Sequence, residues 1–482
     1  MFKIKKPGAK ILALLLLSVC FLYSAPAHGQ QEKPNIIIFL VDDMGYGDIQ
    51  AYGSPYIRTP NIDSLAEEGI RFTSYEAAPW CVPSRAEWMT GIYAPRVHFG
   101  GGTGAGGHGG IPDSILTLAE GLKQAGYATG MAGKWHLGYD PKRYLPTNRG
   151  FDSWLGLPYS NDYKKPYVQT NVPLVMYRDT TVIENPVNQD SMTVKYTAEA
   201  QRFIRAHANK QPIFFYFAYN MVHLPLHTTT AFLGKSGVGL LGDAVEAVDW
   251  SVGQVLKTLD EEGLTKNTIV IFASDNGPWN AAPARMFRKP KKPEGSNKKL
   301  WYRGNRPWDA GTTGPLRGYK HTTYEGGTRV PAIIRWPGHI KSGQVSSALV
   351  TNMDMFRTLL EIGGGKLPGY RLDGYNMMPF FTGRTNQDPR NQYAYIYHKL
   401  EGIRVANWIL RIGEDGQFKL FNIVEDVGEN YNRAEEKPAL VKKMKTKLDS
   451  LSRAIGVDIA TKPHKDAPAH VGRETDRKGF YQ

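Results

Sequence analysis

Acidic and amide side chains follow two strongly apolar runs of the sequence. Asp42 and Asp43 end the run NIIIFLVDD, and Asp275 and Asn276 end the run TIVIFASDNG. Because ligands of open parallel sheets bind beyond the carboxyl ends of the strands, these four side chains can converge there. Three carboxylates and an amide oxygen form a hard oxygen site suited to Ca²⁺, with Mg²⁺ as the alternative. The competing interpretation is that each pair only caps the helix that follows, which two strands with the same ending disfavour.

Four further polar residues lie near the ends of other predicted strands or in glycine-rich and aromatic surroundings. They are Lys134 and His136 in AGKWHLG, His223 in NMVHLPLH and Lys320 in RGYKHTTYEGGTR. Each of them alone is more often structural than catalytic. As a set, they would supply cations for the oxygens of an anionic substrate and a proton donor for a leaving oxygen.

The N-terminus has the pattern of a removable secretory signal. Lysines precede an apolar run at residues 11–23, and the small-residue motif APA follows it. We expect residues 1–27 to be cleaved and the protein to be exported, either to the periplasm or outside the cell. A membrane anchor is the weaker alternative, because this run is short for a bilayer span. No later segment is long enough, so we expect no stable membrane anchor.

Cys81, in the stretch APWCVPSRAEWMTG, becomes the only cysteine once the predicted signal and its Cys20 are removed. No intramolecular disulfide can then form, although an exported protein meets an oxidising compartment. A lone thiol in that setting is either buried and inert or chemically special.

The composition is basic, with a formal net charge of +14. Outside the cytoplasm, this balance favours an anionic substrate or surface over nucleic acid. The most basic stretch, residues 285–306, is interpreted either as a solvated surface loop or as a guide for a polyanionic chain. The sequence does not indicate the oligomeric state.

Strand-like and helix-like patterns alternate along most of the chain, which predicts an α/β fold with a large, mainly parallel central sheet flanked by helices. Near residue 385 the pattern changes to short antiparallel strands followed by a Lys-rich helix at 437–451. The predicted strands cover 35–43, 70–77, 127–133, 212–220 and 268–277, and the predicted helices of the main domain cover 61–69, 115–126 and 243–262. The predicted domains are a signal peptide (1–27), a catalytic domain (33–385), a C-terminal antiparallel-sheet and helix subdomain (386–460) and a polar tail (461–482).

The spacing C-V-P-S-R-A-E-W-M-T-G from Cys81 resembles the signature of the type I sulfatases, which belong to the alkaline phosphatase superfamily. The similarity continues through PNIIIFLVDDMGYGD, TPNIDSLAEEGIRF, AGKWHLG, NTIVIFASDNGP and YEGGTRVPAIIRWPG. GLPYSND resembles the arylsulfatase A branch, whereas Val427 stands where the family usually has Pro. The resemblance implies an alkaline phosphatase-like fold and the hydrolysis of sulfate esters.

The resemblance also implies that a maturation enzyme oxidises Cys81 to formylglycine (3-oxoalanine), reading Pro83 and Arg85 as part of its signal. The hydrated aldehyde is a geminal diol. One hydroxyl attacks sulfur, and the other remains available to eject sulfate afterwards, so one difficult step becomes two.

The same resemblance assigns roles to the other site residues. A divalent metal, Ca²⁺ in the first place, would be bound by the two strand-end pairs and would contact the modified Cys81. Arg85 and Lys134 would hold the diol, and His136 would act as a base. His223 and Lys320 would bind sulfate oxygens and assist the leaving alkoxide. The predicted substrate-binding residues are Ser160, Asn161, Asp162 and His227.

The predicted function is therefore that of an exported sulfatase, a sulfuric ester hydrolase acting on a sulfated polysaccharide or oligosaccharide. Two alternatives remain at this stage. One is a hydrolase of phosphomonoesters, phosphodiesters or phosphonates from the same superfamily. The other is a catalytically inactive glycan-binding protein, in which Cys81 is not converted.

Overall fold

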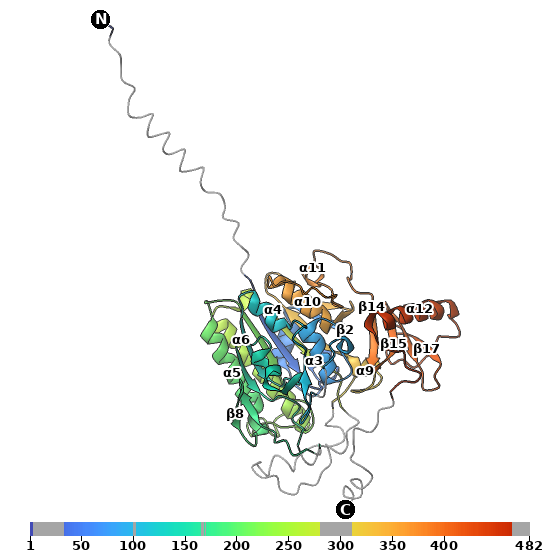
Figure 1. Ribbon diagram of the computed structural model, residues 1–482, viewed down its shortest axis with the longest axis horizontal. Coiled ribbons are helices and arrows are strands. Elements are labelled where there is room, and N and C mark those ends of the chain that lie inside the picture. Colours follow the sequence, from blue (N-terminus) through green and yellow to red (C-terminus); the bar gives the residue numbers. More distant parts are fainter. Residues whose placement is uncertain (3–32, 100–102, 165–167, 169, 280–310, 465–482) are drawn as a thin grey trace, which may run out of the picture. The chain divides into compact units, whose positions relative to one another are not determined.

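The computed structural model describes residues 1–2, 33–99, 103–164, 168, 170–279 and 311–464 (Figure 1). Pro34–Gln482 forms one compact unit, and Met1–Lys33 is a separate one. The predicted signal, apart from its first two residues, the basic segment 285–306 and the tail beyond residue 464 lie outside the described residues. Within the described part, no helix has both the length and the apolar character that a membrane crossing requires.

An eleven-stranded sheet forms the centre of the compact unit, with β10, β1, β9, β4 and β6 in parallel at its middle. The strand order is β12-β2-β11-β10-β1-β9-β4-β6-β7-β8, with β13 also pairing with β2. The strands span β1 Asn35–Val41, β2 Ile70–Glu76, β4 Ala128–Gly133, β6 Ser153–Gly156, β7 Met176–Arg178, β8 Thr181–Glu184, β9 Ile213–Ala218, β10 Thr268–Ser274, β11 Arg329–Arg335, β12 Gln344–Ser346 and β13 Val350–Thr351. A separate two-stranded sheet pairs β3 (Gly109–Gly110) with β5 (Gly138–Asp140).

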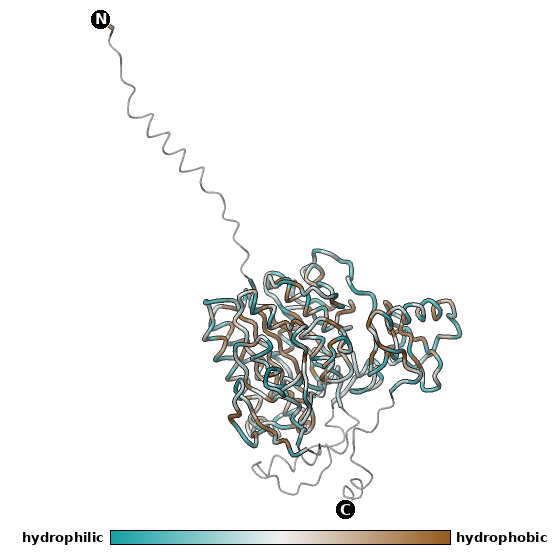
Figure 2. Tube along the Cα trace, in the orientation of Figure 1, coloured by the Kyte–Doolittle hydropathy of each residue, from teal (hydrophilic) through white to brown (hydrophobic). Residues whose placement is uncertain are grey.

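Helices cover both faces of this sheet, so its central strands are apolar on both sides. Successive residues of β1 alternate between two cores: Ile37 and Phe39 pack with α2, α5 and α6, whereas Ile36 and Ile38 pack with α3, α4 and α10. Figure 2 shows the hydrophobic residues concentrated along these strands. The helices span α2 Pro60–Glu67, α3 Cys81–Thr90, α4 Leu118–Gln124, α5 Met192–His207, α6 Leu240–Glu261, α9 Glu325–Thr328, α10 Asn352–Ile362 and α11 Met378–Phe381.

A small antiparallel sheet follows, in the order β14-β15-β16-β17 (Figure 1). It packs with α12 around a third core that includes Tyr395, Ile403, Leu410 and Leu448. Its elements span β14 Gln392–Tyr397, β15 Lys399–Val405, β16 Trp408–Ile412, β17 Phe418–Asn422 and α12 Pro438–Ile455.

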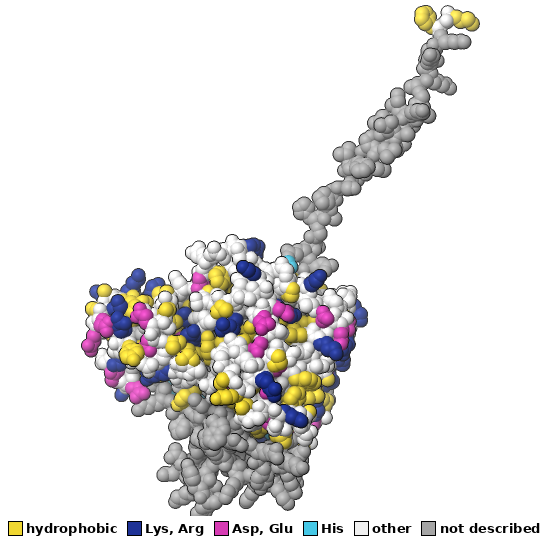
Figure 3. All heavy atoms as spheres, turned by 180° about the vertical axis from the view of Figure 1, so that it is seen from behind, with side chains coloured by type: hydrophobic (Ala, Val, Ile, Leu, Met, Phe, Trp, Pro, Cys, Tyr) yellow, Lys and Arg dark blue, Asp and Glu magenta, His cyan; other side chains and the backbone are white. Residues whose placement is uncertain are grey.

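On the face shown in Figure 3, acidic and basic side chains are interspersed.

The predicted fold class is confirmed: a mostly parallel central sheet between helical layers, with a small C-terminal subdomain. The predicted helices at 61–69, 115–126, 243–262 and 437–451 correspond to α2, α4, α6 and α12. The sheet is not parallel throughout, because β11 runs antiparallel between β10 and β2. The exact domain boundaries stay a prediction.

Candidate active site

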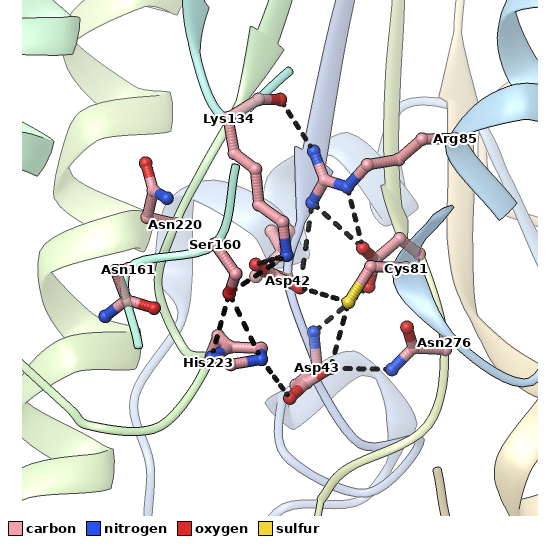
Figure 4. Close-up of polar contacts among 12 residues, drawn as sticks. Asp42, Asp43, Cys81, Arg85, Lys134, Ser160, Asn161, Asn220, His223 and Asn276 are labelled. Carbon is pink, nitrogen blue, oxygen red and sulfur yellow. Dashed lines mark hydrogen bonds and ion pairs between the residues drawn. The ribbon is translucent and has the colours of Figure 1, made fainter. Parts of the chain in front are cut away.

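Five adjacent parallel strands end beside one another, and each is followed by a candidate site residue. Asp42 follows β1, Lys134 follows β4, and Asp275 follows β10. Ser160 lies four residues beyond β6, and Asn220 lies two residues beyond β9. Figure 4 shows that Asp42, Lys134, Ser160 and Asn220 gather around Cys81. Asp275 joins them through Arg85, whose Nε donates to Asp275 Oδ2. The predicted convergence at the carboxyl edge of the sheet is therefore what the structure shows.

The backbone that delivers Lys134 requires a glycine at the preceding position. Gly133 has φ 108, and a Cβ there would lie 1.7 Å from the carbonyl oxygen of Ala218. That same oxygen accepts a 2.7 Å hydrogen bond from the Lys134 amide. The close approach of β4 to β9 thus sets where the Lys134 side chain begins.

Asp42 lies at the centre of the cluster, and its carboxylate is held in the negatively charged form. It is fully buried, and Lys134 Nζ donates to Asp42 Oδ2 at 2.5 Å. Burial alone would raise the pKa of this carboxyl, but the charges of Lys134, His223 and Arg85 outweigh it and hold the pKa well below its usual value.

Cys81 is the first residue of α3, so its side chain lies at the N-terminal end of a ten-residue helix, where the helix dipole favours negative charge. Sγ lies 3.2 Å from Asp42 Oδ1 and 4.0 Å from Asp43 Oδ1, and Lys320 Nζ donates to it at 3.3 Å (Figure 4). Burial, reinforced by Asp42, raises the pKa of the Cys81 thiol well above its usual value. The unmodified side chain is consequently a neutral thiol and a poor nucleophile.

Lys320 and His223 lie on the Asp43 side of the cluster. Lys320 Nζ donates to both oxygens of Asp43, at 2.7 and 2.9 Å, and His223 Nε2 lies 3.7 Å from Asp43 Oδ2. Ser160 Oγ lies 3.3 Å from the same ring nitrogen. Although burial opposes the charge of Lys320, Asp43 outweighs this effect and raises its pKa, so the ammonium group is retained.

Arg85, one turn into α3, connects the two strand ends. Its Nε donates to Asp275 Oδ2 at 3.0 Å, and its Nη1 donates to the carbonyl oxygen of Lys134 at 3.0 Å. The planar guanidinium group is fully buried, and its Nη2 lies 3.7 Å from Asp42 Oδ1.

The residues at the strand ends fit a divalent cation. One ligand atom each from Asp42, Asp43, Cys81 and His223 lies within 4.8 Å of the others. Asn276 donates its Nδ2 to Asp43 at 2.7 Å, whereas its buried Oδ1 has no hydrogen-bond partner among the described residues. A buried carbonyl oxygen without a donor, beside several carboxylates, suits a hard cation.

His136, two residues after Lys134, is buried. Its backbone φ is 59, in the left-handed region. Its ring packs edge-on against Tyr163, and both ring nitrogens lack a hydrogen-bond partner among the described residues. Burial, with Lys134 and Arg85 acting in the same direction, lowers its pKa well below its usual value. The ring is therefore held in its neutral form.

The predicted substrate-binding residues differ in their surroundings. Ser160 contacts both Lys134 and His223. Asp162, two residues later in the sequence, is also buried. Asn161 Nδ2 instead donates to Gln189 and to the carbonyl oxygen of Pro225, each at 3.0 Å. His227 Nδ1 pairs with Asp190 at 2.7 Å. The side chains of Asn161 and His227 are thus engaged by other residues of the protein, and a substrate-binding role for them stays a prediction.

Two residues of the site region were not anticipated from the sequence. Asn220 accepts a hydrogen bond from the Tyr196 hydroxyl at 2.9 Å and lies beside Asn161 in Figure 4. The Trp279 ring lies 4.5 Å from Lys320 Nζ and 5.3 Å from the His223 ring. Each lies close behind an apolar strand run, Asn220 as the last residue of FYFAYN and Trp279 as the last residue of SDNGPW, and this position was a signal that could have found them.

Comparisons with known proteins match this arrangement. The family model described as Sulfatase matches residues 34–365, and that described as N-sulphoglucosamine sulphohydrolase, C-terminal, matches residues 318–452. The rat N-acetylgalactosamine-6-sulfatase is 40% identical over 388 residues, covering 76% of this chain and 69% of the relative. Human arylsulfatase A is 36% identical over 383 residues, covering 76% and 70%. The solved structure of Ps i-CgsB in complex with k-i-k-neocarrahexaose has 27% identity and a TM-score of 0.74, covering 94% of this chain and 100% of that one.

Proposed function

Because the chain belongs to the sulfatase family and hydrolyses sulfate esters, we propose that it is an exported, formylglycine-dependent enzyme that acts on a sulfated glycan. The observation that carries the proposal is the position of Cys81, whose Sγ lies 3.2 Å from Asp42 and 3.3 Å from Lys320 at the start of α3. A residue converted there would face both the carboxylates and the cations of the site.

The substrate class follows from the relatives. The first substrate to test is N-acetylgalactosamine 6-sulfate at the end of an oligosaccharide, since the rat relative is named for that activity and shares 40% identity. The bound hexasaccharide in Ps i-CgsB supports a sulfated carbohydrate more generally. The N-terminal lysines and apolar run support export.

Formylglycine, once hydrated, supplies a hydroxyl nucleophile for sulfur, which the neutral Cys81 thiol does not. Ca²⁺ held by Asp42, Asp43, Asp275 and Asn276, with Mg²⁺ as the alternative, would reduce the repulsion between nucleophile and anion. The buried Oδ1 of Asn276, which has no hydrogen-bond partner in the described part of the chain, supports this ligand set.

The cations and His136 have separate tasks. Arg85, anchored on Asp275 at 3.0 Å, and Lys134 hold residue 81 in place. Lys320 Nζ and His223 Nε2, on the Asp43 side, bind sulfate oxygens and stabilise the leaving oxygen. His136, neutral and without a hydrogen-bond partner among the described residues, accepts a proton at a ring nitrogen when sulfate is released.

The decisive experiment is the mass of the proteolytic peptide that carries residue 81, taken from protein made in its own organism. We expect CHO in place of CH₂SH, and trapping of the aldehyde by a hydrazide. The converted protein should release sulfate from aryl sulfate faster than phosphate from aryl phosphate, and the matched Cys81→Ala variant should release neither. An unmodified thiol would favour the inactive glycan-binding alternative, and faster phosphate release would favour the phosphohydrolase.

A further inference from the structure

A cluster of aromatic and imidazole rings lies beside the candidate active site. The Trp80 and Tyr397 ring centroids are 4.4 Å apart, and Tyr397 stacks on His464 at 3.8 Å. His398 lies 5.2 Å from Trp80, and His321 lies 5.9 Å from Tyr397. We call this cluster the aromatic shelf; its members are Trp80, His321, Tyr397, His398 and His464.

The shelf is joined to the catalytic groups through the chain itself. Trp80 directly precedes Cys81, and His321 directly follows Lys320. The His321 amide donates to the carbonyl oxygen of Pro79 at 2.8 Å, which ties these two segments together. Trp279 continues the row of rings from His321, at 5.6 Å, towards the Lys320 ammonium group. The shelf therefore adjoins the two segments that carry Cys81 and Lys320.

The small C-terminal sheet supplies the far side of the shelf. Tyr397 ends β14, and His398 forms the tight connection to β15. The His464 amide donates to Glu401 Oε1 at 2.6 Å, and Thr323 donates to Glu401 Oε2 at 2.8 Å. Two elements distant in the sequence are thus fixed on each other at the site.

Backbone strain is stored at two shelf positions. His321 has φ 70 and His398 has φ 55, in the left-handed region that residues with a Cβ seldom adopt. Such conformations cluster at binding sites, where surrounding contacts hold them. Here the Tyr397 hydroxyl and His321 Nδ1 lie 3.2 Å apart.

The shelf remains accessible in the described structure. His398 is exposed, and the four other rings are partly exposed. A cavity of about 300 Å³ begins at Trp80 and His398 and is lined further by Val82, Phe99 and Ile396. Open space therefore adjoins Trp80 and His398 of the shelf.

We propose that the aromatic shelf is a binding subsite for the sugar ring attached to the sulfated one. This inference rests on the proposed function. The C–H face of a pyranose is apolar and packs on aromatic faces, while the imidazole edges offer hydrogen-bonding groups to its hydroxyls. Burial, together with His398, lowers the pKa of His464, which suits a neutral hydroxyl-bearing ring. The C-terminal subdomain thereby contributes the contacts that bind the second sugar of the glycan.

Binding is tested in the Cys81→Ala protein, where hydrolysis does not interfere. Calorimetry compares N-acetylgalactosamine 6-sulfate with a trisaccharide that carries this residue at its non-reducing end, in buffer with Ca²⁺. We expect Tyr397→Ala to weaken trisaccharide binding about fivefold more than monosaccharide binding, since one ring contact is worth about 1 kcal/mol. Tyr397→Phe, which keeps the ring, should retain the preference.

The controls separate this inference from the proposed function. Tyr431→Ala, at an exposed tyrosine of the same subdomain, should change neither affinity. His464→Ala repeats the test if Tyr397→Ala does not fold. Equal trisaccharide binding with and without the Tyr397 ring, or no binding in either protein, overturns the subsite. Failure of the converted wild-type enzyme to release sulfate overturns the proposed function instead.

Discussion

At the scale of single residues, the two lysines of the site are held by different carboxylates. Lys134 pairs with Asp42, and Lys320 pairs with Asp43. Burial makes an unpaired charge costly, so each cation depends on its own partner. Removing one cation should therefore impair one task rather than the whole site.

Lys320→Ala tests the assignment of the leaving-group task. We expect kcat for an alkyl sulfate to fall by a factor of about 10²–10³, as it does when a preorganised charge donor is lost. A phenolic sulfate should lose less, because its leaving oxygen needs less stabilisation. Steady-state kinetics on both substrates measures the difference. Lys341→Ala, at an exposed lysine, is the control. Equal losses on the two substrates would argue against this role.

Asn276 tests the metal site without relying on activity. Because its buried Oδ1 lacks a hydrogen-bond partner among the described residues, adding Ca²⁺ to metal-free protein should raise the thermal unfolding temperature, and a chelator should reverse the gain. Asn276→Ala should need more Ca²⁺ for the same gain. Asn391→Ala, at an exposed position, should behave like the wild type. If Ca²⁺ does not change the melting temperature of the wild-type protein, this result would argue against the metal site.

At the scale of elements, the close contact between β4 and β9 places Lys134. Gly133→Ala should destabilise the protein by more than about 3 kcal/mol or prevent folding, because its Cβ would overlap the Ala218 carbonyl oxygen. Gly126→Ala is the matched control: φ is 92, yet no atom of the described residues lies within 4 Å of the added Cβ. It should cost only about 1–2 kcal/mol. Denaturant unfolding of both variants decides whether the clash matters, and similar losses would show that it does not.

The sequence predicted elements well where one pattern dominated. β1 and β10 were found because their apolar runs end abruptly in Asp and Asn. The helix α3 was missed, because nearly all its residues are buried and Pro83 and Ser84 interrupt any amphipathic periodicity. The helix α5 was also missed, although Met192, Tyr196 and Phe203 share its buried face.

At the scale of the whole molecule, prediction of the site depended on which residues had a local signal. Asp42 and Cys81 could be named from the sequence, since strand-end acids and the motif around the cysteine are local. The aromatic shelf could not, because Trp80 and Tyr397 lie far apart in the sequence and meet only in the folded protein, where their ring centroids are 4.4 Å apart. Tertiary packing of this kind leaves no periodic trace in either segment.

A buried ionic network joins the small C-terminal sheet to the central sheet. Glu76, at the end of β2, accepts from Arg404 at 3.2 Å and from the Tyr395 hydroxyl at 3.3 Å. The same hydroxyl donates to Glu325 at 2.6 Å. Burial opposes the charge of Glu325, but Arg329 outweighs it and holds the pKa at about 2. Glu76 therefore faces a carboxylate that stays ionised.

Glu76 should make the stability of the molecule depend on pH. Burial and the charge of Glu325 raise the pKa of Glu76 from 4.5 to about 8, so the folded protein favours the protonated form. The stabilisation that comes from protonated Glu76 is fully present below about pH 4.5 and is lost as the pH rises to about 8. Across this range the free energy of unfolding falls by at most about 1.4 kcal/mol per pH unit. Glu76→Gln, which mimics the protonated acid, should flatten the free energy of unfolding across this range and exceed the wild type near pH 8. Denaturant unfolding at several pH values measures both slopes, with Glu435→Gln at an exposed position as the control. Parallel curves for wild type and Glu76→Gln would mean that this carboxyl does not couple the two sheets to pH.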